Sequence, residues 1–156
     1  MASADGKLRL CPVGPEDREA YLELAWAFYH SPAVLHAVPY SYLERTFEEM
    51  IRSTDYAEGF LLKDADGHLM GYVLLSKTFS QEVGGKAIWI EELFVLPEYQ
   101  GQGVGSCALE MLFERYPDCR RFRLEVEPDN QRAAQLYGRL GFEPLAYRQM
   151  IRDAKE

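Results

Sequence analysis

Residues 86–106 of this 156-residue chain read KAIWIEELFVLPEYQGQGVGS, and this stretch decides the fold. The segment from Ala87 to Leu96 is apolar and rich in β-forming residues, as is typical of a buried strand. It ends at Pro97, and helical spacing of apolar residues returns at Val104. A strand, a glycine-rich turn and a helix start leave N–H groups free at the positive end of a helix. The stretch therefore predicts an anion site.

The glycine-rich turn differs from two common phosphate-binding loops. A dinucleotide fingerprint requires a third glycine where this chain has Ser106, and a Walker loop requires a lysine that the turn lacks. The turn instead resembles the Q/R-x-x-G-x-G/A motif of the GNAT superfamily of acyl-CoA-dependent N-acetyltransferases, through Gln100, Gly103 and Gly105. In that family the loop binds the pyrophosphate of coenzyme A.

A second motif downstream is similar to a signature of the same family. The signature is N-x-x-A-x-x-L-Y-x-x-x-G-F, and the matching positions are Asn130, Ala133, Leu136, Tyr137, Gly141 and Phe142. Two separated motifs in the family's order make a chance resemblance remote.

The composition is typical of one folded domain, residues 1–156. Hydrophobic residues make up 47% of the chain and aromatic residues 13%, which argues against a disordered protein. A formal charge of −8 argues against a nucleic-acid partner, whose phosphates need a basic surface. Three cysteines without a C-x-x-C pair, no signal and no run of about 18 apolar residues favour a cytoplasmic protein without a membrane span. The three histidines lie apart, so no metal site is expected.

The hydrophobic period changes repeatedly along the chain. Strands are predicted at 7–13, 59–63, 71–79, 87–96 and 121–127, with a hairpin turn at 64–67 and one or two final strands in 142–151. Helices are predicted at 14–30, 104–116 and 130–141, and a further helical region opens at Ser31-Pro32, is broken at Pro39 and continues over 42–52. This order resembles the GNAT fold, an α/β (α+β) domain. It has a mixed central sheet, helices on both faces and a splayed, bulged fourth strand next to the fifth.

The apolar pattern of the 87–96 strand is not a regular alternation. Ile90 and Leu93 are three residues apart, whereas Leu93 and Val95 are two apart. The three side chains can face one layer of the core only if an extra residue is absorbed between Ile90 and Leu93, which is what a β-bulge does. We therefore predict a bulge at Glu91-Glu92, where the GNAT family has one.

The resemblance implies how acetyl-CoA is bound. The pantetheine arm would pair with backbone at Phe94 and Val95, and a free N–H near Leu93 would polarise the thioester carbonyl. The pyrophosphate would lie on the loop and the helix start, and Asn130 would cap the second motif's helix or contact the cofactor. The expected cofactor-binding positions are Leu93, Phe94, Val95, Gln100, Gly101, Gln102, Gly103, Val104, Gly105, Ser106, Asn130, Ala133 and Tyr137.

Acetylation of an amine requires a base and benefits from an acid. An amine of the lysine type has a pKa of about 10.4, so it must lose a proton before it attacks a thioester. Glu91 matches the glutamate of polyamine-acetylating members and is the preferred base, with Glu92 in reserve; both could also be ordinary strand carboxylates. Tyr137 matches the family's tyrosine beside the CoA sulfur and is the expected acid, although its spacing alone suits a core aromatic.

Aromatic residues indicate where an acceptor would bind. The expected substrate-binding residues are Tyr29, Tyr40, Tyr42 and Phe79, and the segment 39–42 is interpreted as a loop that forms a lid. Aromatic rings with acidic neighbours suit a cationic amine. We expect an N-acetyltransferase acting on a primary amine of a small cationic metabolite by direct attack in a ternary complex. The alternatives are a protein lysine or N-terminal acetyltransferase and a catalytically weak acyl-CoA-binding module. A homodimer would be common in the family.

Overall fold

The computed structural model describes residues 1–3 and 5–155, which divide into two compact units, Met1–Glu125 and Val126–Glu156. The described residues of the first unit form a five-stranded sheet in the order β1-β2-β3-β4-β5. The strands are β1 (Arg9–Pro12), β2 (Ala57–Lys63), β3 (Leu69–Ser80), β4 (Gly85–Val95) and β5 (Arg121–Leu124). Neighbouring strands are antiparallel except β4 and β5, which are parallel, so the predicted mixed sheet is confirmed.

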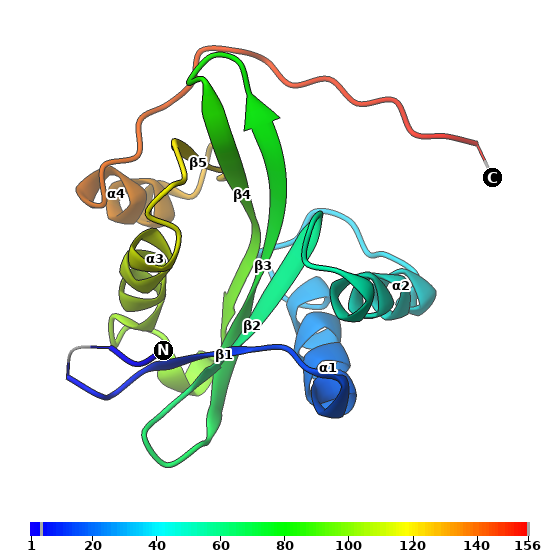
Figure 1. Ribbon diagram of the computed structural model, residues 1–156, viewed down its shortest axis with the longest axis vertical. Helices are drawn as coiled ribbons and strands as arrows, with labels where there is room; N and C mark the ends of the chain where they lie inside the picture. The colour runs from blue at the N-terminus through cyan, green and yellow to red at the C-terminus, as the bar shows by residue number, and fades with distance from the viewer. Residues whose placement is uncertain (4, 156) are drawn as a thin grey trace. The chain divides into compact units, whose positions relative to one another are not determined.

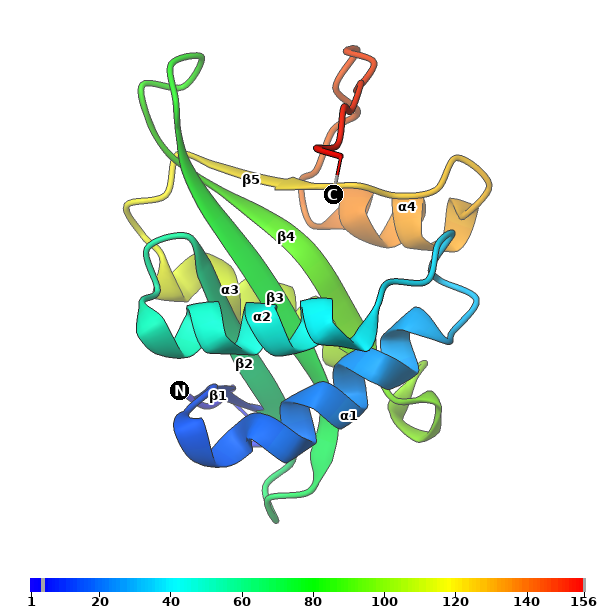
Figure 2. The same ribbon diagram turned by 90° about the vertical axis from the view of Figure 1, so that its right-hand side faces the viewer.

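Three helices of the first unit cover the two faces of this sheet. They are α1 (Arg18–Tyr29), α2 (Tyr40–Arg52) and α3 (Val104–Arg115), and two short 3-10 turns, η1 (Pro15–Asp17) and η2 (Pro97–Tyr99), precede α1 and α3. Figure 1 shows α1 and α2 on one face of the sheet and α3 on the other. Figure 2 looks onto the α1/α2 face, where both helices cross the strands.

The core on the α1/α2 face is formed in part by the apolar side chains that repeat along one side of α1. Tyr21, Leu24 and Ala25 of α1 are buried against strand residues that include Tyr72 and Phe94. On the opposite face, Leu109 and Leu112 of α3 are fully buried. Each sheet face is thus closed by apolar side chains, and a polar group that remains between sheet and helix requires a specific partner.

The second unit contains α4 (Gln131–Arg139). Asn130 is its N-cap and accepts a hydrogen bond from the backbone N–H of Ala133 at 3.1 Å, so the cap predicted from the sequence is confirmed. Gly141 follows the helix with φ +92°, the left-handed conformation that glycine adopts without strain.

Two predicted elements are wrong, and proline accounts for the first. Residues 31–39 contain turns and bends but no helix, and α2 begins at Tyr40 with Pro39 as its N-cap. The residue before a proline is disfavoured in the helical conformation, and the stretch between Pro32 and Pro39 is too short for a stable helix. Tyr40 and Tyr42 therefore lie in the first turn of α2 and not in the expected loop.

The final strands predicted in 142–151 are also missing, because these residues have no strand assignment. Tyr147, Met150 and Ile151 are at least 73% exposed. Alternating hydrophobicity suits a strand, but a strand forms only when a neighbour accepts its hydrogen bonds. The fifth strand is also shorter than predicted and ends at Leu124, so Val126, expected to point inward, is 38% exposed.

No helix among the described residues is long and apolar enough to cross a membrane.

Candidate active site

The predicted β-bulge is present on β4. Leu74 of β3 pairs with Glu92 and the next residue, Leu75, pairs with Ile90, so Glu91 is the extra residue on the β4 side. Val73 pairs with Leu93. Because Val73 and Leu75 share one face of β3, Leu93 and Ile90 share that face as well. The broken alternation in the sequence therefore had the expected structural cause.

The bulge turns two consecutive carboxylates toward one face of the sheet. Glu91 accepts a hydrogen bond from the Ser76 hydroxyl at 2.6 Å, and Glu92 accepts one from the Tyr72 hydroxyl at 2.5 Å. Ser76 and Tyr72 are four residues apart on β3 and share a face. In a regular strand the two glutamates would point to opposite faces, so only the bulge allows both to face α1.

The bulge also marks the point where β4 and β5 separate. Their parallel pairing runs from Ala87–Arg121 to Ile90–Leu124 and ends there. Within the described part of the first unit, no strand pairs with residues 92–95 on the side away from β3. This splayed arrangement was predicted, and it leaves backbone groups of β4 available to a ligand beside the two carboxylates.

Glu92 lies in an aromatic environment. Its Oε2 accepts a hydrogen bond from the Tyr29 hydroxyl at 2.5 Å, and its Oε1 accepts the bond from Tyr72. Burial raises the pKa of Glu92, the two tyrosine hydroxyls lower it, and the charge of Glu91 raises it, with a net upward shift. Burial followed by the contact with Glu92 raises the pKa of Tyr29 as well. Glu91, in contrast, is exposed.

The glycine-rich loop forms the helix start that the sequence predicted. Gly101 and Gly103 have φ angles of +76° and +79°, which side chains rarely adopt, and Gly103 is the N-cap of α3. No side chain caps this end of α3. The first N–H groups of a helix have no intrahelical acceptor, so those of Val104, Gly105 and Ser106 can bind an anion.

The side chain of Gln100 braces this loop. Its Nε2 donates a hydrogen bond to the carbonyl oxygen of Val95 at 2.8 Å and so ties the loop to the end of β4. Gln102 donates similarly to the carbonyl of Glu98 at 3.1 Å. The loop and the strand end beside the bulge are therefore held in one arrangement.

A cavity of about 430 Å³ lies beside the start of α3. Its lining includes Gln102, Gly103 and Val104 of the helix start, the carboxylates of Asp5, Asp64 and Asp66, and Lys7. The three carboxylates outnumber the one lysine and oppose an anion in this cavity. A phosphate would therefore favour the helix end itself over the acidic side of the cavity.

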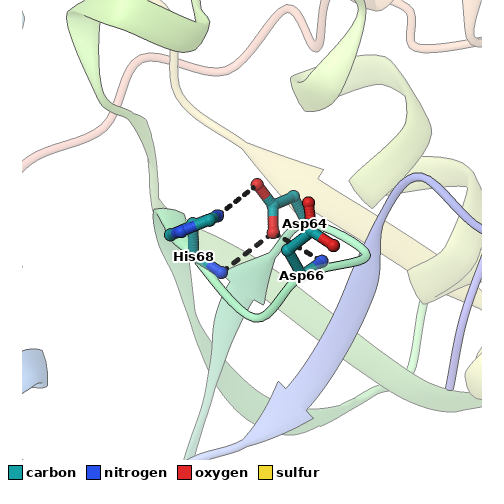
Figure 3. Close-up of side chains that lie close together, drawn as sticks. All are labelled: Asp64, Asp66 and His68. Carbon is teal, nitrogen blue, oxygen red and sulfur yellow. Dashed lines mark hydrogen bonds and ion pairs between the residues drawn. The ribbon is translucent and has the colours of Figure 1, made fainter.

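Asp64, Asp66 and His68 come together in the turn between β2 and β3 (Figure 3). Oδ1 of Asp64 accepts hydrogen bonds from the backbone N–H groups of Asp66 and His68 at 2.9 Å each, and Oδ2 lies 3.1 Å from Nδ1 of His68. Such bonds from an aspartate to the following backbone stabilise tight turns. The hairpin explains the cluster, and we assign no metal to it.

The four aromatic residues expected to bind the acceptor lie in three different parts of the first unit. Tyr29 contacts Glu92. Tyr40 and Tyr42 are 45% and 38% exposed, and Tyr40 packs edge-on against Trp26. Phe79 pairs with Lys86 near the far end of β3 and is 74% exposed. It is an odd number of positions along β3 from Tyr72, so it lies on the opposite face. Among the recorded contacts of the described residues, Tyr29 is the member of this set that reaches the carboxylates.

In the second unit, Ala133 and Tyr137 lie on α4. The ring of Tyr137 packs edge-on against Phe142 with 5.9 Å between centroids, and burial raises the pKa of its hydroxyl. The N–H of Phe142 donates to the carbonyl of Tyr137, which fixes the end of the motif.

Two side chains of this site were missed from the sequence: Tyr72 and Ser76. Both lie in the predicted 71–79 strand, and neither was singled out there. The available signal was a tyrosine in an otherwise aliphatic run, since a buried tyrosine usually has a hydrogen-bond partner for its hydroxyl.

Comparison with known proteins agrees with the geometry of both motifs. The family described as "Acetyltransferase (GNAT) family" matches residues 18–142. Among curated proteins, the thialysine N-epsilon-acetyltransferase of Sus scrofa is 38% identical over 79 residues, covering 49% of this chain and 46% of that protein. The spermine/spermidine N(1)-acetyltransferase of Bacillus subtilis is 28% identical over 83 residues, covering 50% of this chain and 55% of that protein. The chain thus matches about half the length of these relatives.

Solved structures share the fold at low sequence identity. The aminoglycoside N-acetyltransferase AAC(6')-Iy in complex with CoA has a TM-score of 0.72 and 19% identity, with 94% of each chain covered.

Proposed function

The chain belongs to the acetyltransferase (GNAT) family, and we propose that it moves an acetyl group from acetyl-CoA to a primary amine of a small cationic metabolite. The transfer would occur by direct attack of the amine in a ternary complex. One observation carries this proposal: the bulge at Glu91 places two carboxylates on one face at the point where β4 and β5 separate. A base, a thioester and an amine can meet there.

The residues of the first unit fit coenzyme A in two ways. The uncapped start of α3 and the glycines with positive φ offer N–H groups to a pyrophosphate. The unpaired side of residues 92–95 offers backbone groups to the amides of the pantetheine arm. We assign these contacts to Leu93, Phe94, Val95 and to residues 100–106. Asn130, Ala133 and Tyr137 of the second unit are assigned by their match to the family motif.

Glu91 is the proposed base, with Glu92 as the alternative. An ammonium acceptor must be deprotonated before attack, and a carboxylate can accept that proton directly or through water. Glu91 is exposed and its Oε1 accepts only the Ser76 bond among the recorded contacts, whereas each oxygen of Glu92 holds a tyrosine hydroxyl. Accessibility therefore supports Glu91.

Tyr137 is the proposed acid that protonates the departing thiolate. Its raised pKa keeps the hydroxyl protonated at neutral pH. Tyr137→Phe retains the ring that packs on Phe142, so we expect kcat to fall roughly 10- to 100-fold with little change in thermal stability. Single-turnover thiol release measures this step, and an unchanged kcat would remove the acid role.

The acceptor class rests on charge and on the named relatives. Two adjacent carboxylates attract a cation, and proteins that act on thialysine or on spermine and spermidine are among the relatives. Tyr29, whose hydroxyl donates to Glu92, is the aromatic residue that we propose contacts such an amine. Tyr40 and Tyr42 lie in the first turn of α2, and Phe79 lies on the other face of the sheet.

A thiol-release screen tests the function. Acetyl-CoA is incubated with polyamines, diamines, amino acids, aminoglycosides and lysine peptides, and free thiol is followed in each. Turnover with small diamines or polyamines is expected. Preference for lysine peptides or protein N-termini would favour a protein acetyltransferase. Tight binding of acetyl-CoA without thiol release for any amine would favour the alternative of a catalytically weak acyl-CoA-binding module.

A further inference from the structure

Two tyrosines from different elements hold the carboxylate of Glu92. Tyr29 comes from the last residue of α1 and Tyr72 from the middle of β3, and each donates to a different oxygen at 2.5 Å. Tyr72 is 0% exposed, so its hydroxyl has no bulk water as an alternative partner. Hydrogen bonds to an ionised acceptor are the stronger kind, and a paired arrangement also fixes the direction of the carboxylate.

The described residues around Glu92 provide no compensating cation. The titratable groups that face it are Tyr21 and Tyr29 of α1, Tyr72 of β3, and Glu91 beside it on β4. Among residues 1–3 and 5–155, no lysine, arginine or histidine forms an ion pair with Glu92. Phe28 and Phe94 form aromatic contacts with Tyr72. Burial and a neighbouring negative charge both favour the protonated acid, so the tyrosine hydroxyls are what opposes protonation.

We propose that Tyr72 and Tyr29 are positioning residues that keep Glu92 ionised and directed toward the acceptor, so that Glu92 supplies the counter-charge for its ammonium group. The inference rests on the proposed function. Glu91 takes the proton of the attacking amine, while Glu92 binds the cation before that proton is lost. The two adjacent glutamates, which look equivalent in the sequence, thereby have different tasks.

The division of tasks follows from where each tyrosine lies. Tyr72 is fully buried, and within the described part of the chain the recorded hydrogen bond of its hydroxyl goes to Glu92. Tyr29 is half-buried at the C-terminal end of α1, so one of its edges can meet an acceptor while its hydroxyl remains on Glu92. An ammonium that reaches Glu92 supplies the positive charge that the protein omits, and it therefore binds a site already prepared for it.

Tyr72→Phe tests the proposal with Tyr21→Phe as its matched control. Both tyrosines are at most 1% exposed and their rings pack edge-on at 5.5 Å, but no hydrogen bond joins Tyr21 to Glu92 among the described residues. The titration of Glu92 is followed by carboxyl ¹³C NMR, with Glu92→Gln to assign its signal. Tyr72→Phe is expected to raise the pKa of Glu92 by about one, a tenfold tighter hold on the proton, whereas Tyr21→Phe leaves it unchanged.

Acceptor kinetics supply a second readout. In Tyr72→Phe the KM for the amine should rise roughly tenfold on the acid side of its pH profile with kcat nearly unchanged, and the rise should shrink as the pH increases and Glu92 ionises. A loss of packing would instead raise KM equally across the whole pH profile. If Tyr72→Phe does not fold, Tyr29→Phe removes the second donor from a half-buried position and is read in the same way.

A double-mutant cycle decides whether Tyr72 acts through Glu92. In the Glu92→Gln background, Tyr72→Phe should have no further effect on KM, because the carboxylate is already gone. An equal effect in both backgrounds, or a Glu92 pKa that does not move in Tyr72→Phe, would overturn the proposal. The NMR titration needs no turnover, so absence of acetyl transfer to any amine would count against the proposed function and not against this inference.

Discussion

Glu58 and Glu92 lie on opposite faces of the same sheet, and their surroundings shift the pKa values of the two carboxylates in opposite directions. Glu58 of β2, 8% exposed, lies 2.5 Å from Nζ of Lys77, accepts the Tyr116 hydroxyl at 2.6 Å and lies 3.6 Å from Arg115. Burial favours its protonated form, but the bonds and charges of Lys77, Tyr116 and Arg115 outweigh burial and lower the pKa of Glu58. Glu92 has tyrosines and a second carboxylate around it, and its pKa is raised.

The difference fits a structural role for Glu58 and the functional role that we propose for Glu92. Glu58 joins β2, β3 and the end of α3, and the protein supplies its counter-charge. Glu92 is partly buried and has hydrogen-bond donors but no cation in the described parts of the chain. In our proposal the ammonium group of the acceptor supplies that cation.

The largest expected contrast is in turnover. Glu91→Gln should lower kcat about a thousandfold, because an amide cannot accept the amine's proton. Glu58→Gln, on the other face, should leave kcat within about threefold below its unfolding temperature. Thiol release with saturating acetyl-CoA and the best amine of the screen measures both. A rate for Glu91→Gln near that of the parent would transfer the base role away from Glu91.

The second contrast is in stability, and it runs the other way. Glu58→Gln should reduce the free energy of unfolding by about 3 kcal/mol, because Lys77 and Arg115 lose their shared counter-charge. Glu44→Gln is the control: it removes the exposed ion pair with Arg18 and should cost less than about 1 kcal/mol. Urea denaturation measures the free energy of unfolding of both variants. An equal decrease in the two would show that the Glu58 network contributes no more to stability than the exposed ion pair does.

A smaller effect of opposite sign is expected at Glu92. Glu92→Gln should raise the free energy of unfolding by about 1 kcal/mol at pH 7.5, since it removes a partly buried charge that no cation of the described residues balances, while impairing acceptor binding. Glu91 is exposed, so Glu91→Gln should change stability by less than about 0.5 kcal/mol. Thermal unfolding compares them. A destabilised Glu92→Gln would indicate that the tyrosine bonds already satisfy the charge.

The smallest expected effect is the pH dependence of these stabilities. The folded pKa of Glu58 lies below its ordinary value of 4.5, so its contribution is present above that pH and is lost as the pH falls through the folded pKa. The folded pKa of Glu92 lies above 4.5, so its contribution is present below that pH and is lost as the pH rises through the folded pKa. The free energy of unfolding of the parent minus that of each Gln variant is measured from pH 3 to pH 8. This difference should rise with pH for Glu58→Gln and fall with pH for Glu92→Gln. Parallel slopes would contradict the assignment.

The sequence alone determined the features that depend on local spacing. The three-residue step from Ile90 to Leu93 located the bulge, because an alternating strand cannot put both side chains on one face without an extra residue. Gly101 and Gly103 located the turn, since positive φ angles favour glycine, and Asn130 located a helix cap. Where proline intervened the prediction was wrong: a helical region was expected to open at Ser31-Pro32, but residues 31–39 contain no helix.

Only the tertiary structure decided which side chains meet across the sheet. Glu91 and Glu92 are neighbours in sequence, and nothing in their spacing tells that one takes a serine hydroxyl and the other two tyrosines. Tyr29 and Tyr72 lie 43 residues apart along the chain and meet at Glu92 because strand register and helix packing place them there. The pKa of a carboxylate depends on distances to such distant groups, so sequence could name the acids but could not separate their roles.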